Sequence, residues 1–168
     1  MKYSLSLGKP ALVVLTLVAA IGGLLATTAL ASHYRLPADG LVTPKEHRML
    51  EANGLSTTDK VLDYASTDRG RKKLSKYSKI PVPRIVEIVT LCDLLRIDGV
   101  GPSMAKVLQA AGIRDTGPLS TAVPKAVRKA MVKANRGGKI TKVLPDVKTV
   151  TSWVTQAKRM PRLLQGLP

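Results

Sequence analysis

A short glycine-rich turn carries the clearest potential for chemistry in this 168-residue chain. Gly99, Val100 and Gly101 stand directly before a predicted helix, and Ser103 lies in its first turn. Backbone N–H groups at a helix N-terminus have no partner within the helix, so they can bind phosphate and other anions. Lys106 follows one turn later and adds a positive charge. These residues predict an anion-binding site that is built mainly from backbone amides.

The turn joins two predicted helices within residues 94–113. An apolar helix ends before the turn, and the second helix begins at Pro102, whose missing N–H costs nothing at a first helical position. Apolar residues then recur at helical spacing until Gly112 ends the helix. This order is typical of a helix-hairpin-helix motif. Two interpretations stay open: the glycines of the turn bring a phosphate close to the backbone, or they only allow the two helices to pack.

Positive charge is concentrated in the second half of the chain, whose overall formal net charge is +16. Residues 33–98 hold 12 Lys or Arg against 9 Asp or Glu, whereas residues 99–168 hold 13 against 2. This imbalance indicates a polyanionic or acidic partner, which could be nucleic acid, anionic lipid headgroups or an acidic protein surface. One side of a predicted helix forms the expected basic, partner-binding face, which consists of Lys125, Arg128, Lys129, Lys133 and Arg136.

Residue types suited to catalysis or metal binding are scarce. The acidic residues of the second half are Asp115 and Asp146, and both stand where a helix cap is expected. Cys92 is the single cysteine and falls in an apolar stripe, which is typical of a buried, unreactive thiol. His33 and His47 do not form a metal-binding pattern. We therefore expect no catalytic residues, no metal and no cofactor, and a protein that acts by binding.

Residues 1–31 are a predicted membrane-directing segment. Lys2 and Lys9 precede an uncharged, apolar run that ends at Ala31. A signal peptide cleaved after Ala31 is indicated by the small residues at positions 29 and 31. A retained, single-pass signal anchor is favoured by length, because residues 11–31 would form a helix of roughly 31 Å, close to the thickness of a bilayer core.

Positive residues flank both ends of this segment, so the distribution of charge does not decide its orientation. The likeness to a secretory leader decides it instead. We expect the folded domain on the extracytoplasmic side, periplasmic or lumenal. Cleavage of the leader would instead give an exported soluble protein.

The rest of the chain is expected to form one all-α domain. We place a linker at residues 32–42, the domain at residues 43–160 and an extended tail at residues 161–168. The expected helices cover residues 43–53, 58–64, 67–77, 84–96, 102–111, 124–135 and 146–160.

An internal repeat divides this domain. Residues 50–58 match residues 108–116 at a constant offset of 58, which indicates two copies of one helical unit. Val42 stands where the second copy has Gly101, so we expect an intact hairpin in the second copy and a degenerate one in the first.

Four segments resemble an uncharacterised family of small proteins with a tandem helix-hairpin-helix domain of unknown function. The segments are LEANGLSTT, RGRKKL, CDLLRIDGVGPSMAKVLQAAGI and LPDVKTVTSWVTQAKRM. The resemblance covers most of the chain outside the leader and implies a compact all-α fold. Because the family has no settled activity, the resemblance implies no particular function.

Two functions are compatible with these features. The first is a non-enzymatic accessory or scaffold subunit, anchored through residues 11–31, that binds protein subunits of a larger photosynthetic or respiratory membrane complex. A small extrinsic subunit of photosystem II is similar in fold type, an analogy of fold only. The alternative is a module that binds nucleic acid regardless of sequence through the hairpin backbone and the basic helices. Anionic lipid is a third candidate partner.

Overall fold

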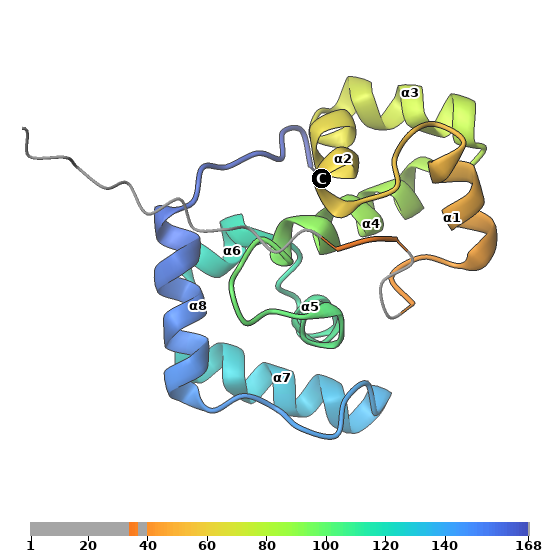
Figure 1. Ribbon diagram of the computed structural model, residues 1–168. Helices are drawn as coiled ribbons and strands as arrows, with labels where there is room; N and C mark the ends of the chain where they lie inside the picture. The colour runs from red at the N-terminus through yellow and green to blue at the C-terminus, as the bar shows by residue number, and fades with distance from the viewer. Residues whose placement is uncertain (1–33, 37–39, 168) are drawn as a thin grey trace, which may run out of the picture.

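The computed structural model describes residues 34–36 and 40–167, which form eight α-helices and no strand (Figure 1). The all-α expectation is confirmed for this part of the chain. The predicted leader at residues 1–31 lies outside the described residues, and none of the described helices is long and apolar enough to span a membrane. The helices are α1 (Pro44–Glu51), α2 (Thr58–Ala65), α3 (Asp68–Ser78), α4 (Val82–Leu94), α5 (Pro102–Ala110), α6 (Thr116–Thr121), α7 (Pro124–Gly138) and α8 (Val147–Arg159).

Local capping explains where the helices begin. The Thr43 hydroxyl accepts the Glu46 N–H at 3.2 Å, and the Glu46 carboxylate accepts the Thr43 N–H at 2.7 Å, which forms a capping box at the start of α1, as the pattern of a threonine followed three residues later by a glutamate predicts. Helix α4 begins and ends two residues earlier than expected. Helix α6 was not expected, because Gly117-Pro118 predicts a turn. These residues instead form the first turn of α6, where the Asp115 side chain caps the Gly117 N–H.

The two halves of the domain, α1–α4 and α5–α8, share three of their helix contacts. In each half the second and third helices pack on the fourth, and the first helix packs on the third. The first helix of each half also ends in the same way, at Gly54 (φ 76°) and Gly112 (φ 89°). In the first half the Leu55 N–H then donates to the Leu50 carbonyl, and in the second half the Ile113 N–H donates to the Leu108 carbonyl, both at 2.9 Å. The two halves therefore share part of their helix packing, although the contact between α2 and α3 has no counterpart of similar size between α6 and α7.

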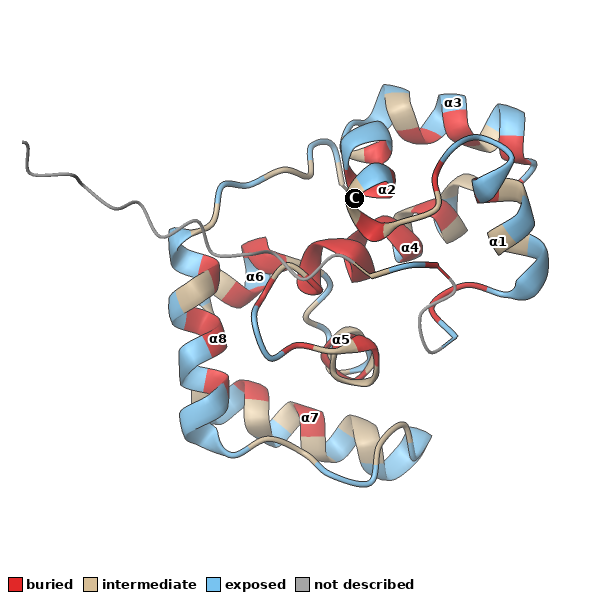
Figure 2. Ribbon diagram, in the orientation of Figure 1, coloured by how far each residue is buried: buried red, intermediate tan, exposed pale blue. Residues whose placement is uncertain are grey.

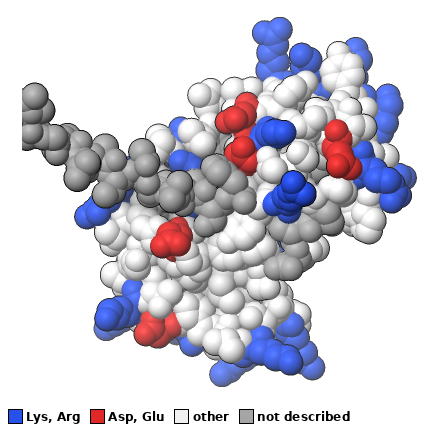
Figure 3. All heavy atoms as spheres, in the orientation of Figure 1, with Lys and Arg blue, Asp and Glu red and all other residues white. Residues whose placement is uncertain are grey.

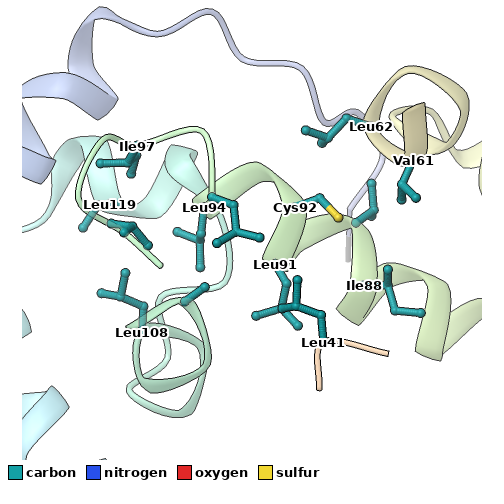
Figure 4. Close-up of a cluster of buried hydrophobic side chains, with 14 of the residues drawn as sticks. Leu41, Val61, Leu62, Ile88, Leu91, Cys92, Leu94, Ile97, Leu108 and Leu119 are labelled. Atoms are coloured by element: carbon teal, nitrogen blue, oxygen red, sulfur yellow. The ribbon is translucent and has the colours of Figure 1, made fainter. Parts of the chain in front are cut away.

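Helix α4 lies at the centre of the apolar core (Figure 2), where it contacts α2, α3 and α5. Figure 4 shows Leu91, Cys92 and Leu94 of α4 among side chains from α2, α5 and α6. Burial raises the pKa of the Cys92 thiol to about 12, so this cysteine is an unreactive part of the core, as expected.

Both ends of the described chain pack on the domain, which therefore extends beyond residues 43–160. Residues 34–36 lie antiparallel to residues 56–58, with the Leu36 N–H donating to the Ser56 carbonyl at 2.9 Å. At the other end, residues 161–167 return from α8 to α2 and α3 (Figure 1), where the Gln165 N–H donates to the Ser66 carbonyl at 2.9 Å. We call residues 161–167 the C-terminal strap.

A buried arginine holds the C-terminal strap in place. Arg71 of α3 is only 1% exposed, and its guanidinium donates four hydrogen bonds to backbone carbonyls. Two acceptors, Ala65 and Ser66, lie at the end of α2, and two, Gln165 and Gly166, lie in the strap. One side chain thus joins the first half of the domain to the end of the chain.

Candidate anion-binding hairpin and basic surface

The turn between α4 and α5 is a hairpin anchored by its central residue. Gly99 adopts φ 81°, and Gly101 is the N-cap of α5. The Val100 side chain is buried in the core, and its N–H donates to the Ile97 carbonyl at 3.0 Å. The Val100 amide is therefore used within the chain and is not available to an anion, although the sequence suggested it.

Helix α8 braces the hairpin from the second half of the domain. The Asp98 N–H donates to Gln156 Oε1 at 2.9 Å, and Gln156 Nε2 donates back to the Asp98 carbonyl at 3.3 Å. The buried Trp153 lies one turn away on α8, with its indole Nε1 beside Gly99. The sequence did not identify either α8 residue as part of the site, since no local pattern links them to a turn more than fifty residues away.

Several amides of the hairpin have no acceptor among the described residues. The first hydrogen bond of α5 runs from the Ala105 N–H to the Gly101 carbonyl at 2.9 Å. The N–H groups of Gly101, Ser103 and Met104 precede that bond, and all three residues are partly exposed. The positive end of the α5 dipole lies at the same place. This end of α5 can therefore accept an anionic or carbonyl oxygen from another molecule.

The two glycines of the hairpin have different structural needs. At Gly99 the positive φ disfavours a side chain, and an added Cβ would lie 3.3 Å from Trp153 Nε1. At Gly101 the backbone is ordinary, with φ −84° and ψ 174°, and an added Cβ would meet nothing within 4 Å. Within the folded chain, a side chain would therefore be strained at Gly99 but would meet no obstruction at Gly101. Space does not require glycine at position 101, although glycine is a favourable N-cap residue.

Lys106 is directed away from the hairpin. Its Nζ lies 3.4 Å from the place of a Cβ on Gly40, the glycine in the turn before α1. Lys106 also lines a cleft of about 930 Å³ that is bounded by α3, α4, α5 and the C-terminal strap, together with Arg114 and the apolar Val86. It is therefore placed towards the first half of the domain, and not beside the amides of Gly101 and Ser103.

The predicted basic face of α7 divides into two parts. Lys125, Lys129, Lys133 and Arg136 are exposed, while the buried side chains of α7 are Val127 and Met131. Arg128 is half-buried, and its Nε donates to the Pro145 carbonyl. Four of the five basic residues are thus available to a partner, and the fifth holds the segment after α7 in place.

The acidic residues of the second half act as helix caps. Asp115 accepts the Gly117 N–H and Asp146 accepts the Thr149 N–H, both at 2.7 Å. Burial raises the pKa of Asp115, and the hydrogen bond from the Thr149 backbone lowers the pKa of Asp146. Within residues 34–36 and 40–167, no group of three or more His, Cys, Asp or Glu side chains could hold a metal ion.

A third carboxylate, which the sequence did not single out, links α4 to α6. Asp93 is 1% exposed and forms an ion pair with Arg96, in which Arg96 Nη1 lies 2.6 Å from Asp93 Oδ1. It also accepts the N–H and the hydroxyl of Thr116, at 2.9 Å and 2.7 Å. All of these contacts stabilise the fold.

These features define an eight-helix, all-α domain with a braced hairpin and a basic surface. Residues 41–160 match the family described as a domain of unknown function, DUF4332, and the chain belongs to that family. The predicted resemblance to a family without a settled function is thereby confirmed. No curated protein and no solved structure is significantly similar to the chain.

Proposed function

We propose that this protein is a non-enzymatic docking subunit of a larger membrane assembly. Residues 1–31 would anchor it in the bilayer, and the folded domain would contact partner subunits on the extracytoplasmic side. The assembly could be photosynthetic or respiratory.

The observation that carries the proposal is the braced hairpin with unused donors. Gln156 and Trp153 fix the hairpin, so its amides do not move to find an acceptor within the chain. The N–H groups of Gly101, Ser103 and Met104 are nevertheless left for an acceptor outside the described residues. A carboxylate or a carbonyl of a partner protein satisfies this need, and the net charge of +16 favours an acidic partner.

We regard α4, the hairpin and α5 as a helix-hairpin-helix motif, with a degenerate counterpart before α1. Gly40 (φ 70°) corresponds to Gly99 (φ 81°), since each precedes the first helix of its half. Thr43, and not Val42 as the sequence alignment indicated, takes the N-cap position that Gly101 has in the second half. Its hydroxyl already accepts a backbone N–H of α1. At the start of α1 one backbone N–H is therefore already bound by the N-cap side chain, whereas Gly101 has no side chain that could bind one at the start of α5.

Purification of the tagged full chain from its own membranes in a mild detergent tests the proposed function. We expect stoichiometric partner proteins, and we expect Gly101→Val to lose them without loss of folding, because a Cβ at this position meets open space. N-terminal sequencing of the same sample determines whether Met1 or Ser32 is the first residue. A chain that purifies alone, or equal recovery of partners with Gly101→Val, would contradict the proposal.

A second candidate is binding to the phosphate backbone of nucleic acid. The glycine at position 101 favours it, because an external phosphate that approaches the α5 amides needs the space that a side chain would fill. The exposed lysines of α7 would add further phosphate contacts.

Duplex DNA of random sequence tests this second candidate. We expect micromolar or tighter binding at low salt that falls by about 10³-fold or more between 50 and 200 mM salt, the loss typical of six or more phosphate contacts. Gly101→Val should abolish binding, whereas Gly137→Ala, at another glycine with open space around it, should not. Weak binding that is equal in both variants would exclude a role for the hairpin.

A further inference from the structure

A second surface, separate from the hairpin, combines positive charge with exposed apolar side chains. It consists of residues 123–148, which include α7 and the segment that follows, and we call it the α7 edge. Residues 124–148 contain eight Lys or Arg and one acidic residue, Asp146. The exposed basic residues of the α7 edge are Lys125, Lys129, Lys133, Arg136, Lys139, Lys142 and Lys148.

Hydrogen bonds hold the segment after α7 alongside the helix. The Asn135 side chain donates to the Thr141 carbonyl at 2.9 Å and accepts the Thr141 N–H at 3.0 Å. Nearer the start of α7, Arg128 donates to the Pro145 carbonyl. The segment therefore runs back along α7, and both form one end of the molecule (Figure 1). In Figure 3 blue lysine and arginine atoms lie at both sides of this lower end, with an acidic group beside those at the left and an uncharged middle between.

Exposed valines accompany these charges. Among the described residues, five large hydrophobic side chains are exposed, and three of them belong to the α7 edge. Val123 precedes α7 and is 65% exposed, Val143 lies in the middle of the following segment at 74%, and Val147 begins α8 at 38%. The folded chain does not bury these side chains, so they are available to another surface.

The mixture of valine and lysine distinguishes between anionic partners. A phosphate backbone offers little to an exposed valine, and single-strand binders use aromatic side chains, which residues 124–148 lack. An anionic bilayer attracts lysine and arginine to its headgroups and accepts small apolar side chains at the headgroup boundary. Charge and hydrophobicity together therefore favour a lipid surface.

We propose that the α7 edge binds the headgroups of an anionic bilayer, with Val143 and Val147 entering the headgroup boundary. This contact goes beyond docking to partner subunits, because it uses a different surface from the hairpin. In an anchored protein it orients the domain on the membrane, so that the hairpin is presented in a fixed direction.

A fluorescent label at position 143 tests the contact in the full chain. Cys92 is buried in the core, so in a Val143→Cys variant the label attaches to the new cysteine alone. The labelled chain is reconstituted in nanodiscs of phosphatidylcholine, with or without phosphatidylglycerol. We expect a blue-shifted emission and quenching by lipids with a brominated acyl chain only in the discs that contain phosphatidylglycerol.

Charge reversal provides matched controls. Lys129→Glu, Lys133→Glu and Arg136→Glu together should reduce the quenched fraction at least about tenfold, since each basic residue near an anionic surface contributes roughly fivefold. The same reversal of three basic residues on α3, at Lys72, Lys73 and Lys76, should leave it unchanged. Circular dichroism confirms that each variant is folded.

Three results would overturn the proposal: quenching in discs of phosphatidylcholine alone, an equal effect of the α3 reversal, or a label that responds to duplex DNA and not to phosphatidylglycerol. The purification of partner subunits described above is an independent readout. If the lipid contact is absent but partner subunits are recovered, only the proposed lipid contact of the α7 edge is contradicted. If the lipid contact is present but no partner subunits are recovered, only the docking function is contradicted.

Discussion

Asp98 and Gln156 are joined by two hydrogen bonds across 58 residues of sequence. The Asp98 N–H donates to Gln156 Oε1 at 2.9 Å, and Gln156 Nε2 donates to the Asp98 carbonyl at 3.3 Å. This reciprocal pair fixes the hairpin on α8, while the adjacent amides at the start of α5 stay available. A rigid hairpin with unused donors is suited to binding because little conformational entropy is lost when a partner docks.

Replacement of Gln156 by alanine should loosen the hairpin. We expect the free energy of unfolding to fall by about 1 kcal/mol, because two backbone groups lose their partner. Hydrogen exchange at the Asp98 amide should become faster by a factor of ten or more. Gln165→Ala, at an exposed glutamine of the C-terminal strap, is the control and should leave that amide unchanged. Equal exchange rates in the wild type and in Gln156→Ala would show that α8 does not brace the hairpin.

The two hairpin glycines should respond differently to alanine. Gly99→Ala should cost about 1–2 kcal/mol of stability, because alanine must adopt φ 81° and its Cβ approaches Trp153. Gly101→Ala should cost less, about 0.5 kcal/mol, since its conformation suits any residue but alanine is a poorer N-cap than glycine. Thermal unfolding of both variants checks the difference, and a larger loss at position 101 than at position 99 would refute this account of the turn.

Arg71 should contribute to stability through the C-terminal strap. Arg71→Leu removes four hydrogen bonds to backbone carbonyls, so we expect a loss of about 3 kcal/mol. Deletion of residues 163–168 removes two of the same bonds, and the two changes should therefore not be additive. Urea unfolding of the single and double variants measures the coupling. Strict additivity would mean that Arg71 and the strap act independently.

The ion pair between Glu46 and Arg84 should make stability depend on acid pH. Hydrogen bonds from Arg84 lower the pKa of Glu46 from 4.5 to about 2. Because the pKa is lower in the folded state, the pair stabilises the fold above about pH 4.5, and this contribution is lost as the pH falls from 4.5 towards 2.

Glu46→Gln should remove this pH dependence. We expect a loss of about 2 kcal/mol at pH 7 and a shrinking difference from the wild type as the pH approaches 2. Asp68→Asn is the control, since its ion pair with Lys72 is exposed and should change stability little. Urea unfolding at pH 7, 4.5 and 3 gives the comparison. A difference between Glu46→Gln and the wild type that stays constant from pH 7 to 3 would contradict the assignment.

Local features of the fold could be predicted from the sequence, because their signals lie within a few residues. Thr43 and Glu46 predicted the capping box of α1, and Pro102 marked the first residue of α5. The internal repeat predicted the related positions of Gly54 and Gly112. Each of these follows from helix geometry and needs no knowledge of tertiary contacts.

Features that depend on distant contacts could not be predicted. Arg71 lies in a run of basic residues that indicates a solvated face, yet it is buried because carbonyls 94 and 95 residues away accept its hydrogen bonds. Likewise, Gln156 has no local pattern that links it to Asp98. The sequence pointed to the amides of Gly101 and Ser103 and not to that of Met104, and it included Val100 because its bond to Ile97 leaves no trace in the sequence.

Site-specific photo-crosslinking in native membranes tests the docking function most directly. A photoreactive amino acid is placed at Ser103, beside the unused amides of the hairpin, and at Lys76 on α3 as the control. The docking function predicts a defined protein adduct from position 103 that resists nuclease and is absent from position 76. No protein adduct at position 103, the same adducts at both positions, or an adduct that nuclease removes would contradict it.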